Sequence, residues 1–148
     1  MFNKILAPFD GSKLSECTLN QLKDVASGCQ VSEVVLLTVI DRLPDFTGTP
    51  EEFVRKSQEL RFEAARSYLD RIANNLKKEG INTNIYVVEG QAADEILDYV
   101  KENKIDLVVM STHGRSGIAR WTIGSVADKV VRHSPVPVLT VAPAGCRA

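Results

Sequence analysis

Short apolar runs alternate along the chain with longer segments that have the periodicity of amphipathic helices. Each connection between parallel strands needs a crossover, and an alternating strand-helix pattern is typical of a doubly wound α/β fold. The sequence therefore predicts a β-α-β-α-β-α-β-α-β chain and a five-stranded parallel sheet, and we expect the strand order 3-2-1-4-5 with helices on both faces. The expected strands are residues 4–9, 33–40, 82–88, 105–110 and 136–141.

The expected helices lie between these runs, and glycine or proline ends each of the first, second and fourth. The segment 51–78 carries apolar residues in steps of three and four, with charges between them. We interpret this stripe as the face that packs on the sheet. The helices are expected at residues 12–28, 51–78, 92–102 and 125–133.

The composition is that of an ordinary globular domain, with 148 residues, 44% of them apolar and 25% charged. We expect one domain over residues 1–148. A net charge of -1 makes nucleic acid an unfavourable partner. The sequence shows no apolar stretch of the ~20 residues that a membrane span needs and no signal peptide, which predicts a cytoplasmic protein without a membrane partner. Three cysteines and two histidines without zinc-finger spacing predict no metal site.

Three of the expected loops follow strands and carry polar or glycine residues. In open parallel sheets, ligands bind beyond the carboxyl ends of the strands. The sequence therefore predicts a single site where these loops meet. The three loops are residues 10–12, the segment from residue 41 onward, and residues 111–125.

The loop 111–125 has the chemistry of an anion site. Gly114, Gly117 and Gly124 permit close approach of the backbone, Ser125 begins a helix, and Arg115 adds positive charge. The sequence lacks the P-loop and the dinucleotide-binding glycine pattern. On local chemistry alone, the glycines could equally shape a turn, with Ser125 as a helix cap.

Three segments of the sequence resemble the universal stress protein family. These are KILAPFDGS at 4–12, LLTVID at 36–41 and VVMSTHGRSGIARWTIGSVADKVVRHSPVPVLTV at 108–141. The ATP-binding branch of that family carries the pattern G-x2-G-x9-G-[ST]. Gly114, Gly124 and Ser125 match this pattern, and Ser111 stands where it has glycine.

The resemblance implies an adenine-nucleotide site, with ATP as cofactor and Mg²⁺ or Mn²⁺ as its companion through the phosphates. Asp10 would contact the ribose or adenine, and the backbone of Val39 would meet the adenine edge. The alternative for Asp10 is a local turn in Asp-Gly-Ser, and both roles can hold at once. The remaining residues would form an adjacent wall (Ala7, Pro8) or surround the phosphates and ribose (Met110, Ser111, Gly114, Gly124, Ser125, Val126).

Three functions remain open at this stage. The first is a homodimeric, nucleotide-dependent regulator of a stress response that acts through a protein partner. The second is a slow ATP hydrolase that uses the same pocket. The third is a dimeric interaction module that binds no nucleotide. His113 in the loop is a candidate general base, although a lone histidine more often makes a structural hydrogen bond. No catalytic residue is assigned.

Homodimerisation is expected through the last strand, residues 136–141. This strand is apolar and comes last in the chain, which favours an edge position open to a second copy. The alternative is an edge covered by the tail, residues 143–148.

Overall fold

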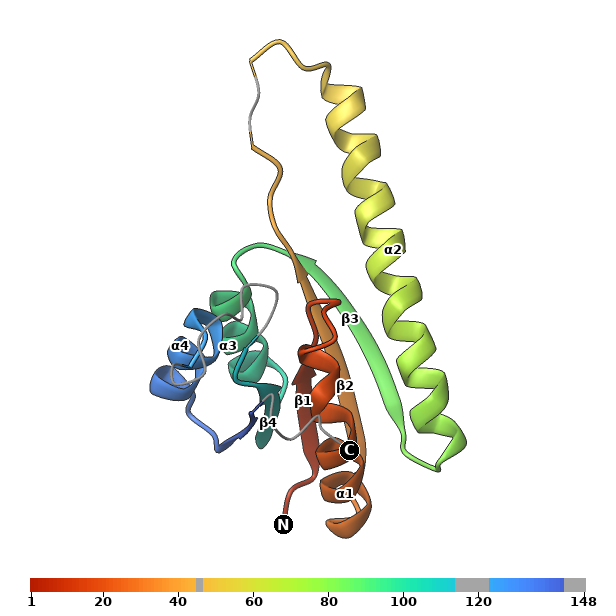
Figure 1. The fold of residues 1–148 in the computed structure, drawn as a ribbon, viewed down its shortest axis with the longest axis vertical. Helices are drawn as coiled ribbons and strands as arrows, with labels where there is room; N and C mark the ends of the chain where they lie inside the picture. The colour runs from red at the N-terminus through yellow and green to blue at the C-terminus, as the bar shows by residue number, and fades with distance from the viewer. Residues whose placement is uncertain (45–46, 114–122, 143–148) are drawn as a thin grey trace.

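The computed structural model describes residues 1–44, 47–113 and 123–142. The strands form one parallel sheet in the order β3-β2-β1-β4-β5 (Figure 1). The predicted fold class and strand order are therefore confirmed. The strands are β1 (Lys4–Pro8), β2 (Glu33–Ile40), β3 (Thr83–Glu89), β4 (Leu107–Ser111) and β5 (Val138–Val141).

The helices cover both faces of the sheet, and each lies between two strands in sequence. They are α1 (Leu19–Gly28), α2 (Glu51–Lys78), α3 (Ala92–Glu102) and α4 (Ser125–His133). Three of them have the predicted bounds, whereas the helix expected from residue 12 begins later. A 3₁₀ turn, Ser15–Thr18, precedes α1. None of the helices in the described ranges is long and apolar enough to cross a membrane.

Side chains of successive strand residues enter two separate cores, because they point alternately to opposite faces of the sheet. Ile5 and Leu36 belong to the core under α1 and α2, and Leu6 and Leu37 to the core under α3 and α4. All four are fully buried. This two-sided burial explains why the central strands read as continuous apolar runs.

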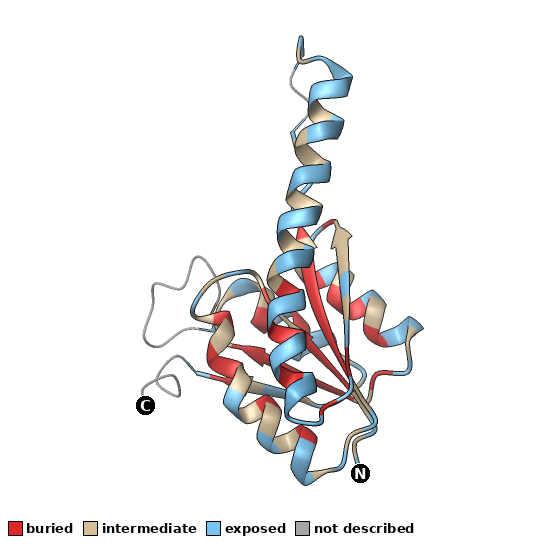
Figure 2. Ribbon diagram, turned by 90° about the vertical axis from the view of Figure 1, so that its right-hand side faces the viewer, coloured by how far each residue is buried: buried red, intermediate tan, exposed pale blue. Residues whose placement is uncertain are grey.

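The interpretation of α2 as a sheet-packed helix along its whole length is wrong. Its buried residues are confined to the C-terminal part, Leu69 to Leu76, and the N-terminal half projects beyond the sheet (Figures 1 and 2). Successive residues of a helix are about 100° apart, so a step of four advances the stripe by about 40°. Over several such steps the stripe winds around the helix, and Phe53 and Leu60 lie exposed.

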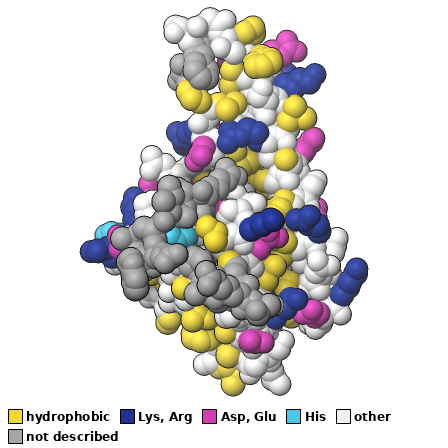
Figure 3. Space-filling view, viewed as in Figure 1, with side chains coloured by type: hydrophobic (Ala, Val, Ile, Leu, Met, Phe, Trp, Pro, Cys, Tyr) yellow, Lys and Arg dark blue, Asp and Glu magenta, His cyan; other side chains and the backbone are white. Residues whose placement is uncertain are grey.

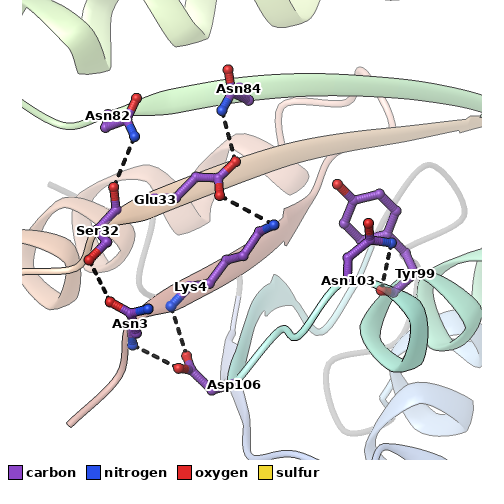
Figure 4. Close-up of polar contacts among 9 residues, drawn as sticks. All are labelled: Asn3, Lys4, Ser32, Glu33, Asn82, Asn84, Tyr99, Asn103 and Asp106. Carbon is purple, nitrogen blue, oxygen red and sulfur yellow. Dashed lines mark hydrogen bonds and ion pairs between the residues drawn. The ribbon is translucent and has the colours of Figure 1, made fainter.

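Polar side chains connect neighbouring strands at the amino end of the sheet (Figure 4). Glu33 on β2 accepts a hydrogen bond from Asn84 on β3 at 2.8 Å and pairs with Lys4 on β1 at 3.2 Å. Asp106, just before β4, accepts hydrogen bonds from the backbone N–H groups of Asn3 and Lys4. These contacts fix the relative position of four strands at the end of the sheet opposite to their carboxyl ends.

The hydrogen bond from Asn84, together with the charge of Lys4, lowers the pKa of Glu33 below its ordinary value of 4.5. A carboxyl group whose pKa is lowered by folding stabilises the fold above its unfolded pKa. That contribution is lost as the pH falls through the lowered value.

We therefore predict that Glu33→Gln reduces the free energy of unfolding at pH 7 by up to ~1 kcal/mol. The difference from the wild type should shrink as the pH falls below 4.5 and vanish below the lowered pKa of Glu33, where the folded wild-type carboxyl group is itself protonated. Urea unfolding at pH 7 and pH 3.5 measures both values. Glu79→Gln, which breaks the more exposed ion pair with Lys23, is the control; an equal loss in both variants would contradict the assignment.

Candidate functional site

The carboxyl ends of β1, β2 and β4 meet the first turns of α3 and α4 around a cavity of about 220 Å³. Their convergence follows from the parallel sheet, because every strand ends at the same edge. The cavity is lined by residues from all five of these elements and their connections: Pro8, Phe9, Asp10, Ser15, Leu37, Val39, Asp41, Ala92, Ile96, Met110, Ser111, Thr112, His113, Gly124, Ser125, Val126 and Ala127.

Most of the site residues that the sequence predicts lie around this one cavity. Ala7 does not line it, because its side chain is fully buried in the core beside α1 and α2. Gly114, Arg115 and Gly117 lie outside the described residues. The predicted residues that the structure brings together are Pro8, Asp10, Val39, Met110, Ser111, Gly124, Ser125 and Val126.

The N-terminus of α4 faces the cavity through Ser125, Val126 and Ala127. The first N–H groups of a helix have no acceptor within the helix, and among the described residues no side chain caps this end. The backbone N–H groups and the positive end of the helix dipole together favour a negatively charged group at this position. Ser125 is therefore the first residue of the helix and not its side-chain cap.

Gly124 is required by the protein itself. Its N–H donates to the carbonyl of Thr112 at 2.7 Å, and a Cβ at this position would lie 2.8 Å from the same oxygen. This distance is below the contact limit of real side chains and involves backbone atoms that cannot turn away. A larger residue at 124 would therefore shift the β4 to α4 connection, whether or not a ligand is present.

Asp10 holds the turn that follows β1. Its Oδ1 accepts hydrogen bonds from the N–H of Ser12 at 2.9 Å and from the Ser12 hydroxyl at 2.6 Å. Gly11 has a φ of 85°, which glycine adopts without strain. The local turn is thus present, and Asp10 also lines the cavity. The two roles considered for this residue are compatible in one geometry.

Ser111 uses its hydroxyl within the loop. Ser111 Oγ donates to the carbonyl of His113 at 2.7 Å and accepts from the His113 N–H at 3.2 Å. The side chain is 7% exposed. A serine at this position therefore closes a tight turn at the end of β4, so its hydroxyl proton is already engaged.

His113 lines the cavity and carries a buried ring nitrogen without a hydrogen-bond partner among the described residues. Its Nδ1 lies 2.8 Å from the hydroxyl of Thr112, whereas Nε2 is buried and has no hydrogen-bond partner. A buried polar atom without a partner is costly, and a polar ligand atom would relieve that cost. His113 is thus a structural residue through Nδ1, and its Nε2 is a buried nitrogen that the described residues leave without a partner.

Several lining residues were not predicted from the sequence. Ala92 and Ile96 come from α3, whereas Asp41 begins the second of the three loops that the sequence predicts at the site. The rule that ligands meet the carboxyl ends of strands applies equally to the connection from β3 to α3. That connection has no glycine-rich or charged signature, but its position alone could have placed Ala92 at the site.

A second hollow of about 320 Å³ shares Asp10, Val39 and Asp41 with the first. Arg61 from α2 lines it and donates to the carbonyl of Asp41 at 2.8 Å. Tyr68 also lines it, and burial raises the pKa of this residue to about 12, so its hydroxyl stays protonated at neutral pH. The two hollows together form one extended region with acidic side chains at one end and the α4 N-terminus at the other.

The described part of the chain offers no obvious metal centre. No group of three or more His, Cys, Asp and Glu side chains is placed there to hold an ion.

Comparison with known proteins links this geometry to a family. Residues 1–142 match the model of the universal stress protein family. The chain is 32% identical over 142 residues to universal stress protein MJ0531 of Methanocaldococcus jannaschii, covering 95% of this chain and 82% of that protein. It is 28% identical to the solved structure of MJ0577, with a TM-score of 0.83 and 96% of both chains covered; MJ0577 is a universal stress protein of the same organism.

Two more distant structures share the fold and contain ligands. A universal stress protein in complex with cAMP is 23% identical, with a TM-score of 0.64 and 96% and 98% of the two chains covered. A universal stress protein family protein from Arabidopsis thaliana with AMP bound is 18% identical, with a TM-score of 0.64 and 95% and 91% covered. The sheet has the strand order that the sequence predicts. Because the family model matches residues 1–142, the chain belongs to the universal stress protein family.

Proposed function

We propose that the chain, acting as one domain, binds ATP at the cavity beyond the carboxyl ends of β1, β2 and β4. The observation that carries the proposal is the uncapped N-terminus of α4, whose first three residues line this cavity. It supplies backbone N–H donors for phosphate oxygens without a P-loop. Two relatives of the same fold, solved with cAMP and with AMP, support an adenine nucleotide.

The nucleoside part has suitable partners at the other end of the cavity. Asp10 and Asp41 are acceptors for ribose hydroxyls, and the end of β2 at Val39 offers backbone groups to an adenine edge. Leu37, Ile96 and Met110 supply apolar surface. With the adjoining hollow, the space exceeds the ~300 Å³ at the lower end of small-molecule pockets.

We assign the protein a regulatory binding role, in the cytoplasm, in which the nucleotide state is read by a protein partner during a stress response. Rapid hydrolysis needs a fixed metal and a positioned water. Mg²⁺ or Mn²⁺ would reach this site through the phosphates. Slow hydrolysis is the second candidate function, because His113 lines the cavity and the described residues give its Nε2 no hydrogen-bond partner.

We further propose that two copies pair through β5 across a two-fold axis. β5 lies at one edge of the sheet. One side of this strand is hydrogen-bonded to β4, and no described strand pairs with the other side. Leu139 is 37% exposed on this strand. An apolar edge strand invites antiparallel pairing with a second copy, which would satisfy the open backbone groups.

We predict that Ser125→Asp weakens ATP binding while the fold is retained. A carboxylate at a helix N-terminus favours the helix but repels phosphate oxygens. ATP affinity should fall by about tenfold or more, equivalent to ~1.4 kcal/mol, whereas adenosine affinity should change little. Calorimetric titration of ATP with Mg²⁺, AMP and adenosine measures this pattern, and Ser125→Asn is the uncharged control.

Asp10→Asn tests the nucleoside end in the same titrations. Asparagine can keep the hydrogen bond to the Ser12 N–H, so the turn is preserved, but the charged acceptor for ribose is lost. Adenosine and ATP should then weaken together. The proposed site is wrong if wild-type protein binds none of the three ligands or if Ser125→Asp binds ATP as the wild type does.

For the dimer, we predict that Leu139→Lys halves the mass measured by light scattering, because two like charges would meet near the two-fold axis. Val131→Lys is the matched control, since Val131 on α4 is similarly exposed, at 44%. An unchanged mass for Leu139→Lys would contradict pairing through β5.

A further inference from the structure

The projecting half of α2 carries a stripe of four residues, of which Phe53, Leu60 and Ala64 are exposed and Ser57 is half-buried. This outer stripe consists of Phe53, Ser57, Leu60 and Ala64, spaced by four, three and four residues. Phe53 is 65% exposed and Leu60 is 60% exposed. Hydrophobic side chains lie among charged ones along this projecting part of the molecule (Figure 3).

The outer stripe is not part of the core in any described contact. At about 100° per residue, its centre lies roughly 140° around the helix from the buried face at Leu69 to Leu76. Only its last residue, Ala64, comes near the sheet, because it lines the second hollow together with Thr38 and Val39 of β2. Such a run of helix, with no buried residue before Leu69, depends on something other than the domain core for packing.

We propose that the outer stripe pairs with the outer stripe of a second copy as a short antiparallel coiled coil. Alternation of three- and four-residue steps is the seam spacing of such pairs. When Ser57 lies opposite Leu60 of the second copy, Phe53 lies opposite Ala64. Each large side chain then meets a small one on both sides of the two-fold axis.

Charges beside the outer stripe match the same register. Lys56 and Glu63 lie on the same flank of the stripe. Antiparallel pairing places Lys56 of one copy next to Glu63 of the other, and the two-fold axis repeats this contact, so there are two such pairs. Neither residue belongs to an ion pair within the described chain. In a parallel pairing, Lys56 would instead meet Arg61 of the second copy, which is a repulsive contact. The charge pattern therefore favours the antiparallel arrangement.

The geometry of the molecule permits this contact. The paired segments, residues 53–64 of each copy, span about 12 residues, or ~18 Å, and the two folded bodies lie beyond opposite ends of the coiled coil. α2 packs against β3, at the opposite edge of the sheet from β5. The contact is therefore independent of the proposed β5 pairing, and one chain can make both. The inference does not depend on nucleotide binding.

The test uses complementary charge variants of the full chain. Lys56→Glu and Glu63→Lys each place like charges at both flanking contacts, whereas an equimolar mixture of the two restores opposite charges at both. Sedimentation velocity at ~10–100 µM suits a contact of this small size. All samples also carry Leu139→Lys, so that pairing through β5 does not contribute to the mass.

The parent protein here is the chain that carries Leu139→Lys alone. We expect the parent and the mixture of the two variants to associate, and we expect the association constant of each variant alone to be at least about tenfold lower. Lys101→Glu on exposed α3 surface is the matched control for net charge and should behave as the parent. Leu60→Asp should dissociate the pair, while circular dichroism and nucleotide affinity remain those of the parent. The proposal is overturned if the mixture associates no more strongly than its components, or if the parent is a monomer throughout this range.

Discussion

All five strands run in the same direction, and the candidate site depends on this constraint more than on any single residue. Parallel strands place every strand-to-helix connection at one edge of the sheet. The turn after β1, the end of β2 and the first turns of α3 and α4 therefore converge, although they are separated by up to about 115 residues in the sequence. The cavity is a consequence of topology, and the side chains then determine its chemistry.

The two ends of the sheet have different roles. At the amino end, Glu33 connects Lys4 and Asn84, and Asp106 binds the start of β1, which fixes the strand positions. At the carboxyl end, the polar groups are arranged around an open space. Satisfied hydrogen bonds at one end and the unpaired His113 Nε2 at the other are the pattern expected when one end stabilises the fold and the other receives a ligand.

Several residues at the site maintain the local structure and also line the cavity. Asp10 closes a turn, Ser111 closes another, and Gly124 lies against the carbonyl of Thr112. Substitutions that remove these local contacts therefore change the shape of the loops as well as any binding. Ser125 differs, because it makes no capping contact and its helix end is open to the cavity. It is the position at which binding and folding can be separated most cleanly.

Sequence alone determined the class of the fold and most of the residues of the candidate site, because apolar runs, helical periodicity and glycine-containing turns are local properties. Eight of the twelve predicted site residues line the cavity, and three others lie outside the described residues. Only tertiary structure placed Ala7 in the core and brought Ala92 of α3 to the site, since both depend on how strands and helices pack. The tertiary structure also determined which part of α2 packs on the sheet. The stripe on this helix looks continuous in sequence, but it winds around the helix, and the sheet is long enough to cover only its last turns.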